Sequence, residues 1–321
     1  MAERIPKVLV IGPAYVDMAV KCDTFPEPGK AVEGSGFSCM PTGAGVNEAI
    51  QSALCGCEVW LLARIGEDAF GEMIKQALRR FGVSTDLVYL TQAISTGIVV
   101  TLVNAHGENR SCRSAGANRV LGRDEIEYAA AEQLIQAADV CLISDGVSPV
   151  AAVAAIRTAH MHNTPVVLEA RLPAVDRRVL HTIDWSVDFY NADVVVLRFD
   201  GVVCGSELGS SGEGDLKLIG TEIIACGAKC VVISMGWHGA LVIDRQGYRR
   251  IPGIMLEVVD QTGCESAFAG ALAACYGCGD NPDMAVKFAV AAETLARSRF
   301  GLHDALPKKE DILMLLQNQP D

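Results

Sequence analysis

Aromatic residues are scarce in this sequence, positive charge is the minority sign, and long apolar runs are missing. Phe, Trp and Tyr make up 6% of the 321 residues, and 27 Lys and Arg stand against 39 Asp and Glu, a formal net charge of −12. This acidic balance argues against a broad nucleic-acid-binding or anionic-membrane surface, because both require positive charge. No stretch of about 18 predominantly apolar residues is present, so we expect no transmembrane helix.

Regular cysteine spacing is also missing, although the chain has 12 cysteines. Cys275 and Cys278 form a lone Cys-x-x-Cys pair without a second pair at zinc-finger distance, so we predict no metal ligands. The pattern favours reduced cysteines that pack as small apolar side chains in a reducing compartment. The first ten residues lack an apolar segment and a small-residue cleavage site. We therefore expect no signal peptide and a cytoplasmic location.

What the chain does have is apolar material for a large core, since 50% of its residues are hydrophobic. Residues 7–12 (KVLVIG) are typical of a buried strand, and residues 70–81 of an amphipathic helix that Gly82 closes. Similar strands and helices alternate along most of the chain, including a predicted helix over residues 124–137. This alternation predicts an α/β fold, with a mostly parallel central sheet flanked by helices on both faces.

Two segments, residues 14–40 and 95–118, do not follow this rhythm. Both alternate polar and apolar residues, contain turn residues and lack a helical period, so we predict that they form a small β-sheet lid outside the main sheet. No internal repeat, low-complexity tract or long linker divides the sequence. We therefore expect one α/β domain over residues 1–321, with the lid inserted in it.

Three turns with glycines are candidates for ligand contact. Residues 42–47 (TGAGVN) and residues 260–266 (DQTGCES) each open a predicted helix, where free N–H groups favour a polar or anionic ligand. Residues 234–239 (SMGWHG) join two predicted strands. A tight strand-to-helix turn explains the first cluster equally well, and a hairpin turn explains the third.

In this order and spacing, the three clusters resemble the ribokinase-like (phosphofructokinase B-type) carbohydrate kinase family. Residues 64–71 (RIGEDAFG) match a common stretch of that family, and residues 95–97, 107–110 and 116–118 match its lid strands. The resemblance covers almost the whole chain. It implies a Rossmann-like ribokinase fold that binds ATP and a sugar between the sheet and the lid.

The resemblance also implies roles for individual positions. The positions implied to bind the sugar are Asp17, Gly43, Gly45, Asn47 and Asn118. The positions implied to bind the nucleotide are Ser234, Gly236, Gly239, Thr262 and Gly263. The implied reaction is transfer of a phosphoryl group from ATP, with Mg²⁺, to a hydroxyl of a small sugar or nucleoside. Lid-to-lid dimers in the family imply a homodimer.

The second signature departs from the family's usual wording, Asp-Thr-Thr-Gly-Ala-Gly-Asp, at the positions that carry its chemistry. Ser266 occupies the position of the general base, and a serine is no base at neutral pH without a partner to deprotonate it. Glu265 stands beside Gly263 in the anion hole, where its carboxylate would repel a transferring phosphoryl group. Cys264 lies at the same helix start, which permits a redox role, although a packing role is the simpler interpretation.

The positions implied to organise magnesium and phosphate differ as well. Arg198 and Gly201 replace the family's Asn-x-x-Glu, and Arg171 falls where the family has an Asp-x-Asn pattern. An arginine can pair bidentately with a carboxylate that is costly to leave isolated in a cleft. We therefore predict that Glu265 forms a salt bridge with Arg198 or Arg171 and itself occupies the helix-start anion site.

Two functions remain open from the sequence. One is an ATP-dependent sugar or nucleoside kinase that uses Mg²⁺, is weakly active or inactive, and has Glu265 as a substitute base. The other is a non-catalytic pseudokinase that binds a sugar or nucleoside and has lost phosphoryl transfer, in which case no cofactor is expected. The sequence names neither the sugar nor the oligomeric state.

Overall fold

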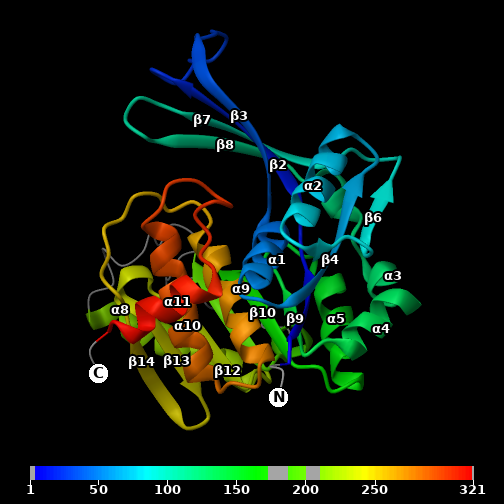
Figure 1. Ribbon diagram of the computed structural model, residues 1–321, viewed down its shortest axis with the longest axis vertical. Coiled ribbons are helices and arrows are strands. Elements are labelled where there is room, and N and C mark those ends of the chain that lie inside the picture. The colour runs from blue at the N-terminus through cyan, green and yellow to red at the C-terminus, as the bar shows by residue number, and fades with distance from the viewer. Residues whose placement is uncertain (1–3, 173–186, 200–209, 320–321) are drawn as a thin grey trace.

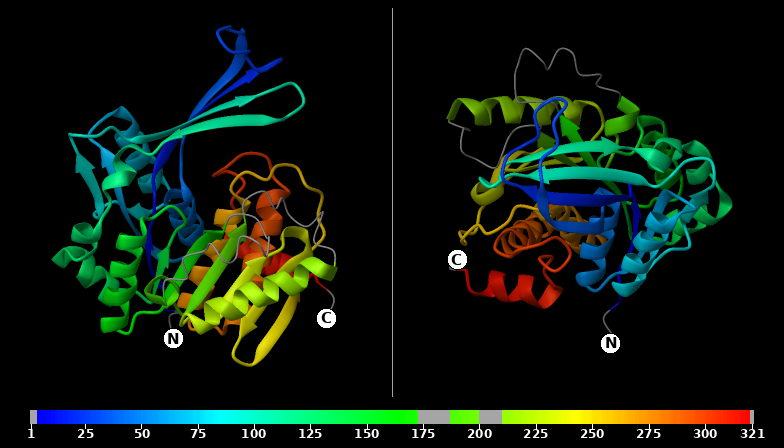
Figure 2. Two further views of the ribbon diagram at one scale, coloured as in Figure 1. Left: turned by 180° about the vertical axis from the view of Figure 1, so that it is seen from behind. Right: turned by 90° about the horizontal axis from the view of Figure 1, so that it is seen from above.

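The computed structural model describes residues 4–172, 187–199 and 210–319, which form a main sheet with helices on both faces and a small separate sheet (Figures 1 and 2). In spatial order the main-sheet strands are β14 (Gly247–Pro252), β13 (Gly239–Asp244), β12 (Cys230–Ser234), β11 (Val194–Phe199), β10 (Val166–Leu172), β9 (Val140–Ile143), β1 (Lys7–Ile11), β4 (Glu58–Gly66) and β5 (Val83–Ser84), and β6 (Val88–Thr91) pairs with β4. The strands from β12 to β5 are parallel, whereas β13 and β14 are antiparallel. The predicted mostly parallel α/β fold is confirmed.

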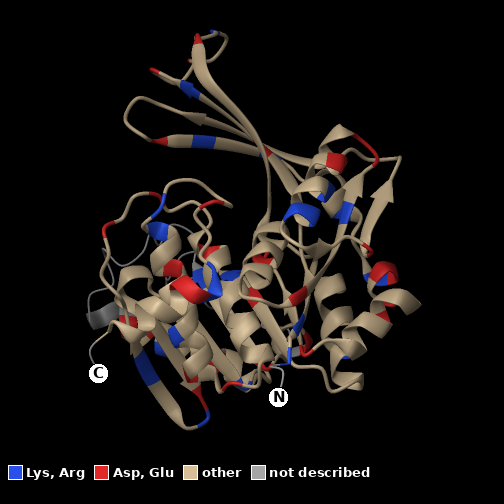
Figure 3. Ribbon diagram, viewed as in Figure 1, with Lys and Arg blue, Asp and Glu red and all other residues tan. Residues whose placement is uncertain are grey.

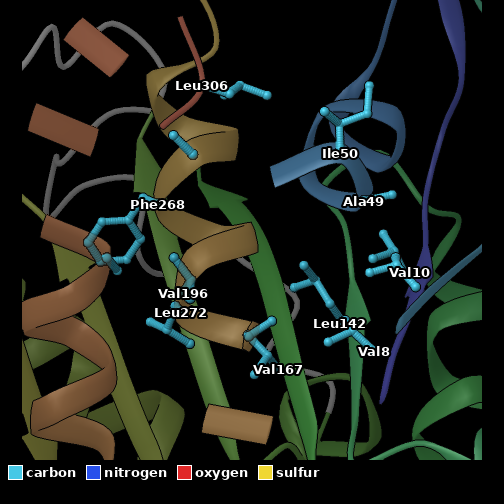
Figure 4. Packing of buried hydrophobic residues seen from close by; sticks show 14 of the residues in the cluster. Val8, Val10, Ala49, Ile50, Leu142, Val167, Val196, Phe268, Leu272 and Leu306 are labelled. Atoms are coloured by element: carbon cyan, nitrogen blue, oxygen red, sulfur yellow. The ribbon is translucent and has the colours of Figure 1, made fainter. Parts of the chain in front are cut away.

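Helices cover both faces of this sheet because its strands are apolar on both sides. Val8 and Val10 of β1 belong to the core under α1, α9 and α10, and Leu9 and Ile11 to the core under α4, α5 and α8. Figure 4 shows part of the first of these cores, in which Ala49 lies near Val10 of β1. The helices are α1 (Ala44–Leu54), α2 (Ala69–Arg80), α3 (Arg123–Ile126), α4 (Ala129–Ala137), α5 (Pro149–Met161), α7 (Val187–Tyr190), α8 (Ser210–Ala225), α9 (Cys264–Gly277), α10 (Pro282–Arg297) and α11 (Lys309–Gln317), with 3₁₀ turns η1 (Gly116–Val120) and η2 (Gly236–His238).

The small sheet has the order β3 (Gly34–Thr42), β2 (Tyr15–Cys22), β7 (Gly97–Val103) and β8 (Asn109–Ser114). Strands β2 and β7 are parallel, and each outer pair is antiparallel. The sheet projects from the main body, and its β7–β8 hairpin extends over the part that holds α9 and α10 (Figure 1). We call this sheet the lid.

Charges of both signs are interspersed over the molecule in the view of Figure 3, without a basic face. Within residues 4–172, 187–199 and 210–319, no helix combines the length and the apolar character that crossing a membrane requires. One predicted helix, over residues 124–137, is interrupted. It is divided into α3 and α4, because Tyr128 has an extended backbone (φ −67°, ψ 135°).

Candidate active site

A cleft of about 450 Å³ lies between the lid and the carboxyl ends of the parallel strands, the usual position of ligand sites in open α/β sheets. Its walls come from four parts of the fold. The start of α1 and the residues just before it contribute Thr42, Gly43, Ala44 and Asn47, and the lid contributes Tyr15, Val99, Ser111 and Arg113. The carboxyl ends of the main-sheet strands contribute Pro13, Asp145, Glu169, Arg171 and Arg198, and the start of α9 contributes Gln261, Gly263, Glu265 and Ser266.

The cleft brings together residues that the resemblance assigned to different roles. Gly43 and Asn47, implied to hold the sugar, share the walls with the catalytic positions Gly263, Glu265 and Ser266. The two departures from the family pattern, Arg171 and Arg198, line the same cleft, and Gly201 lies outside the described residues.

Three residues implied to bind the sugar are not part of the cleft lining. Asp17 lies in register with Val99 on the cleft side of the lid, but its carboxylate accepts a hydrogen bond from the Thr101 hydroxyl at 2.9 Å. Gly45 allows α1 to approach β1, since a Cβ on it would lie 2.6 Å from the carbonyl carbon of Gly12.

Asn118 is the third of these residues, and its side chain bonds to the backbone instead. Its Oδ1 accepts from the Ala14 N–H at 2.8 Å, and its Nδ2 donates to the carbonyl oxygens of Ala14 (2.8 Å) and Ala115 (2.9 Å). These bonds tie the start of lid strand β2 to the turn before η1. Asn118 therefore anchors the lid.

The positions implied to bind nucleotide lie apart from the cleft walls, except Gly263. Ser234 donates at 2.9 Å to the buried Glu293, and Gly236 and Gly239 bound the turn η2 between β12 and β13. Thr262 forms a local turn, in which its N–H and hydroxyl both donate to Oδ1 of Asp260, at 2.9 and 2.7 Å.

The Glu265 carboxylate lies between two arginines. Its Oε2 is 3.0 Å from Nη2 of Arg171 and 2.9 Å from Nη1 of Arg198. Arg171 also donates to Oδ2 of Asp145 at 2.9 Å, and Arg198 donates to the backbone carbonyl of Glu265. The predicted salt bridge is confirmed, and it forms with both arginines. Burial would raise the pKa of Glu265, but Arg198 and Arg171 outweigh burial and hold the pKa below its ordinary value.

A buried polar chain fixes Arg198 in this position. Its side chain, 6% exposed, forms an ion pair with Glu169, which is 2% exposed. Next to Glu169 lies Glu48 of α1, which accepts a hydrogen bond from the Ser144 hydroxyl at 2.6 Å. Burial, followed by the charge of Glu169, raises the pKa of Glu48 well above its ordinary value and favours its protonated form. Because Glu48 is neutral in this form, it adds no unpaired charge to the buried network of Arg198 and Glu169.

Ser266 follows Glu265 in the first turn of α9, where the N–H groups of a helix have no partner within the helix. The turn is possible because Gly263 adopts a left-handed conformation (φ 78°) before the helix begins. Ser266 is 8% exposed. In the part of the chain that the structure describes, no carboxylate or imidazole accepts a hydrogen bond from its hydroxyl, so no group there could deprotonate it.

His303 was missed by the sequence reasoning. Its Nε2 lies 3.1 Å from Oδ1 of Asn47, across 256 residues of sequence. Burial lowers the pKa of His303 to about 4, against the raising effect of Asp304. The neutral ring, in its Nε2–H form, donates to Asn47 and fixes that amide in the cleft wall. No sequence signal marked His303, whereas Asp145 could have been noticed because it follows a buried strand.

Among the described residues, those at this edge of the sheet do not fit a magnesium site. Mg²⁺ prefers carboxylate and carbonyl oxygens, but Asp145 and Glu169 are each paired with a guanidinium group. The described residues contain no group of three or more His, Cys, Asp or Glu that could hold a metal ion. A divalent cation at these carboxylates would have to displace Arg171 or Arg198.

A mostly parallel sheet, a separate β lid and a polar cleft between them define an α/β protein of the ribokinase fold, the fold class that the sequence predicted. The family model for pfkB family carbohydrate kinases matches residues 5–309, so the chain belongs to this family.

Known relatives resemble the chain over nearly their whole length. The ribokinase of Bacillus subtilis (strain 168) is 28% identical over 316 residues, which cover 96% of this chain and 99% of the relative. Mouse ribokinase is 24% identical over 326 residues, covering 98% and 96%. The deoxyribokinase of Salmonella typhi is 24% identical over 303 residues, covering 94% and 96%.

Solved structures agree with this fold. The Arabidopsis thaliana ribokinase complexed with ribose and ATP superposes with a TM-score of 0.83 at 21% identity, covering 98% of this chain and 100% of that one. Ribokinase from Thermotoga maritima gives a TM-score of 0.80 at 20% identity, with the same coverage. At these identities the likeness shows the shared fold.

Proposed function

We propose that this protein binds a small sugar or nucleoside in the cleft and transfers phosphoryl groups weakly or not at all. The observation that carries the proposal is the Glu265 carboxylate, held by Arg171 and Arg198 at the start of α9. Family membership gives the chain the pocket of a carbohydrate kinase, and this ion pair changes what the pocket can do.

The first change concerns the anion site. The start of a helix attracts negative charge through its dipole and free N–H groups. Here a carboxylate of the protein supplies that charge, and both neighbouring arginines are bound to it. A triphosphate would have to displace Glu265 or bind against the electrostatic repulsion of its carboxylate.

The second change concerns proton transfer. A kinase of this type gains from a base that removes the proton of the attacking hydroxyl, typically a factor of about 10²–10⁴. Ser266 cannot act as this base alone. Glu265 is a poor substitute, because two guanidinium groups hold its pKa below the ordinary value and so weaken it as a proton acceptor. This weighs against the alternative of an active kinase with Glu265 as base.

The test separates binding from turnover. Calorimetric titration with a panel of pentoses, hexoses and nucleosides should give binding heat for at least one of them. ADP release from Mg-ATP with the same ligands should stay near background. Robust turnover that survives both Glu265→Gln and Ser266→Ala would contradict the proposal and also exclude both residues as the base.

A further inference from the structure

On the lid side of the cleft stands an arginine that has no acidic partner among the residues that the structure describes. Arg113 of β8 lines the cleft, and no Asp or Glu of the described residues lies within 4.0 Å of its guanidinium group. Its guanidinium group lies over the Tyr15 ring, with Cζ 5.8 Å from the ring centroid. Arg171 and Arg198, by contrast, are both paired with carboxylates.

We infer that the ligand of this cleft is a sugar acid, a polyhydroxylated monoanion whose carboxylate pairs with Arg113. The inference rests on the proposed function of the same cleft as a ligand site, and it adds the chemical class of the ligand. An arginine presents two parallel N–H groups to a carboxylate, a geometry that a neutral hydroxyl cannot use fully.

The register of the lid directs Arg113 toward the cleft. Arg113 pairs with Val99, and both line the cleft together with Ser111, which lies two residues away on the same strand face. Alternation along a strand places Arg110 on the opposite face. Arg110 lies over the Phe25 ring, with its Cζ 4.4 Å from the centroid. One strand thus carries a cleft-facing arginine and an outward-facing one.

The groups beside Arg113 suit the hydroxyls of such a ligand. The Thr101 hydroxyl donates to Asp17 at 2.9 Å, and it lies 3.0 Å from the Ser111 hydroxyl. Because the hydrogen of Thr101 is used on Asp17, Ser111 must donate in the second bond. The Ser111 oxygen therefore retains its lone pairs and can accept a hydrogen bond from a ligand hydroxyl. Through these two hydrogen bonds, Asp17 has an indirect role at the cleft.

The opposite wall limits the charge that a ligand can carry. Asp145, Glu169 and Glu265 all line the cleft, and their repulsion of an anionic ligand increases in proportion to the charge of that ligand. A phosphorylated sugar is close to a dianion at neutral pH, whereas a sugar acid carries a single charge that one free guanidinium group can match. The geometry thus favours a carboxylate over a phosphate.

The experiment compares matched ligands by calorimetry on the full chain. The probes are glucose with gluconate, ribose with ribonate, glucuronate, and glucose 6-phosphate. We expect a sugar acid to bind roughly ten-fold or more tightly than its neutral partner, as one charge-assisted bond supplies. Arg113→Gln should remove this preference, so that the acid and its neutral partner bind with similar affinity. The matched control Arg110→Gln, on the same strand, should keep it.

Each other outcome has a defined meaning. A preference for the acid that survives Arg113→Gln, a stronger preference for glucose 6-phosphate, or no binding of any sugar acid would overturn the inference. Tight binding of neutral sugars alone would overturn the inference and leave the proposed function standing. Turnover of a bound sugar acid in the presence of Mg-ATP would overturn the proposed function and leave the ligand class standing.

Discussion

Glu265 and Arg198 are joined twice at the start of α9: the guanidinium group lies 2.9 Å from the carboxylate and also donates to the backbone carbonyl of Glu265. One arginine therefore fixes both the side chain and the first turn of the helix. Because Arg198 is nearly buried and Glu265 is about half exposed (6% and 56% of their side chains), the buried partner determines where the exposed one lies.

Arg198→Met should destabilise the fold strongly. It leaves Glu169 buried without its cation, and breaking a buried pair in this way typically costs about 3–5 kcal/mol. Arg171→Met is the matched control, because Arg171 also binds Glu265 but its side chain is 33% exposed. The control variant should lower the free energy of unfolding by less than about 1 kcal/mol. Urea unfolding measures both, and equal losses for the two variants would contradict the assignment of Arg198 as the buried anchor.

Asn118→Ala should destabilise the lid rather than weaken ligand contacts directly. The change removes three side-chain bonds to the backbone of Ala14 and Ala115. Each buried group left unpaired costs about 1–3 kcal/mol. We expect faster amide exchange in β2 and β7, together with a lower unfolding free energy. Asn109→Ala, at an exposed position of lid strand β8, is the control. If amide exchange in β2 and β7 is unchanged but ligand affinity is lost, the result would instead support the sugar-contact role that the resemblance implied.

His303 should make stability depend on pH. Its folded pKa of about 4 lies below the ordinary value of 6.5, so the unfolded chain binds more protons between these values. The stability that neutral His303 contributes to the fold is fully present above pH 6.5 and is lost as the pH falls from 6.5 toward 4. One pKa unit corresponds to about 1.4 kcal/mol, so lowering the pH from neutral to about 5 should reduce the free energy of unfolding by roughly 2 kcal/mol through this group.

The comparison for His303 is His303→Gln, whose amide can also donate to Asn47 but does not titrate. Chemical unfolding near pH 7 and near pH 5 should show that the wild type loses more stability than the variant on acidification. Equal losses in the two proteins would show that His303 is not held neutral by its surroundings.

A sheet of this kind is predictable because buried parallel strands are continuous apolar runs, as in residues 7–12, and their helices have a clear period. The short strands β5 and β6, together with β14, were not predicted. With two to six residues, they carry too little periodicity to separate them from loops. The break at Tyr128 was also missed, since its apolar neighbours continue the helical pattern.

The site was predictable in part, for a physical reason. Glu265, Arg171 and Arg198 were recognisable because each departs in charge from a motif, and opposite charges in one cleft pair. The anchoring role of Asn118 depends on backbone groups that a motif does not name. Arg113 and His303 depend on lid register and on a contact across 256 residues, which no local pattern encodes.

Restoring the two family residues should restore turnover in part. In the double variant Glu265→Gly, Ser266→Asp, the helix start is free and a carboxylate stands at the base position. With a bound sugar and Mg-ATP, ADP release should rise by about 10² or more over the wild type, the usual contribution of a general base. The control is Glu265→Gly, Ser266→Asn, which has a side chain of similar size but no base. Equal rates in the two double variants would count against the absence of a base as a cause of low activity.

The most direct measurement is a calorimetric titration of ATP, with and without Mg²⁺, into the wild type and Glu265→Gly. If the carboxylate of the protein occupies the phosphate site, removing it clears the start of α9 and takes one carboxylate partner from each arginine. ATP affinity should then rise about ten-fold or more, the effect of one relieved ionic contact. Glu72→Gly, which removes a first-turn glutamate from α2, should leave ATP affinity unchanged. Unchanged or weaker ATP binding in Glu265→Gly would contradict the account.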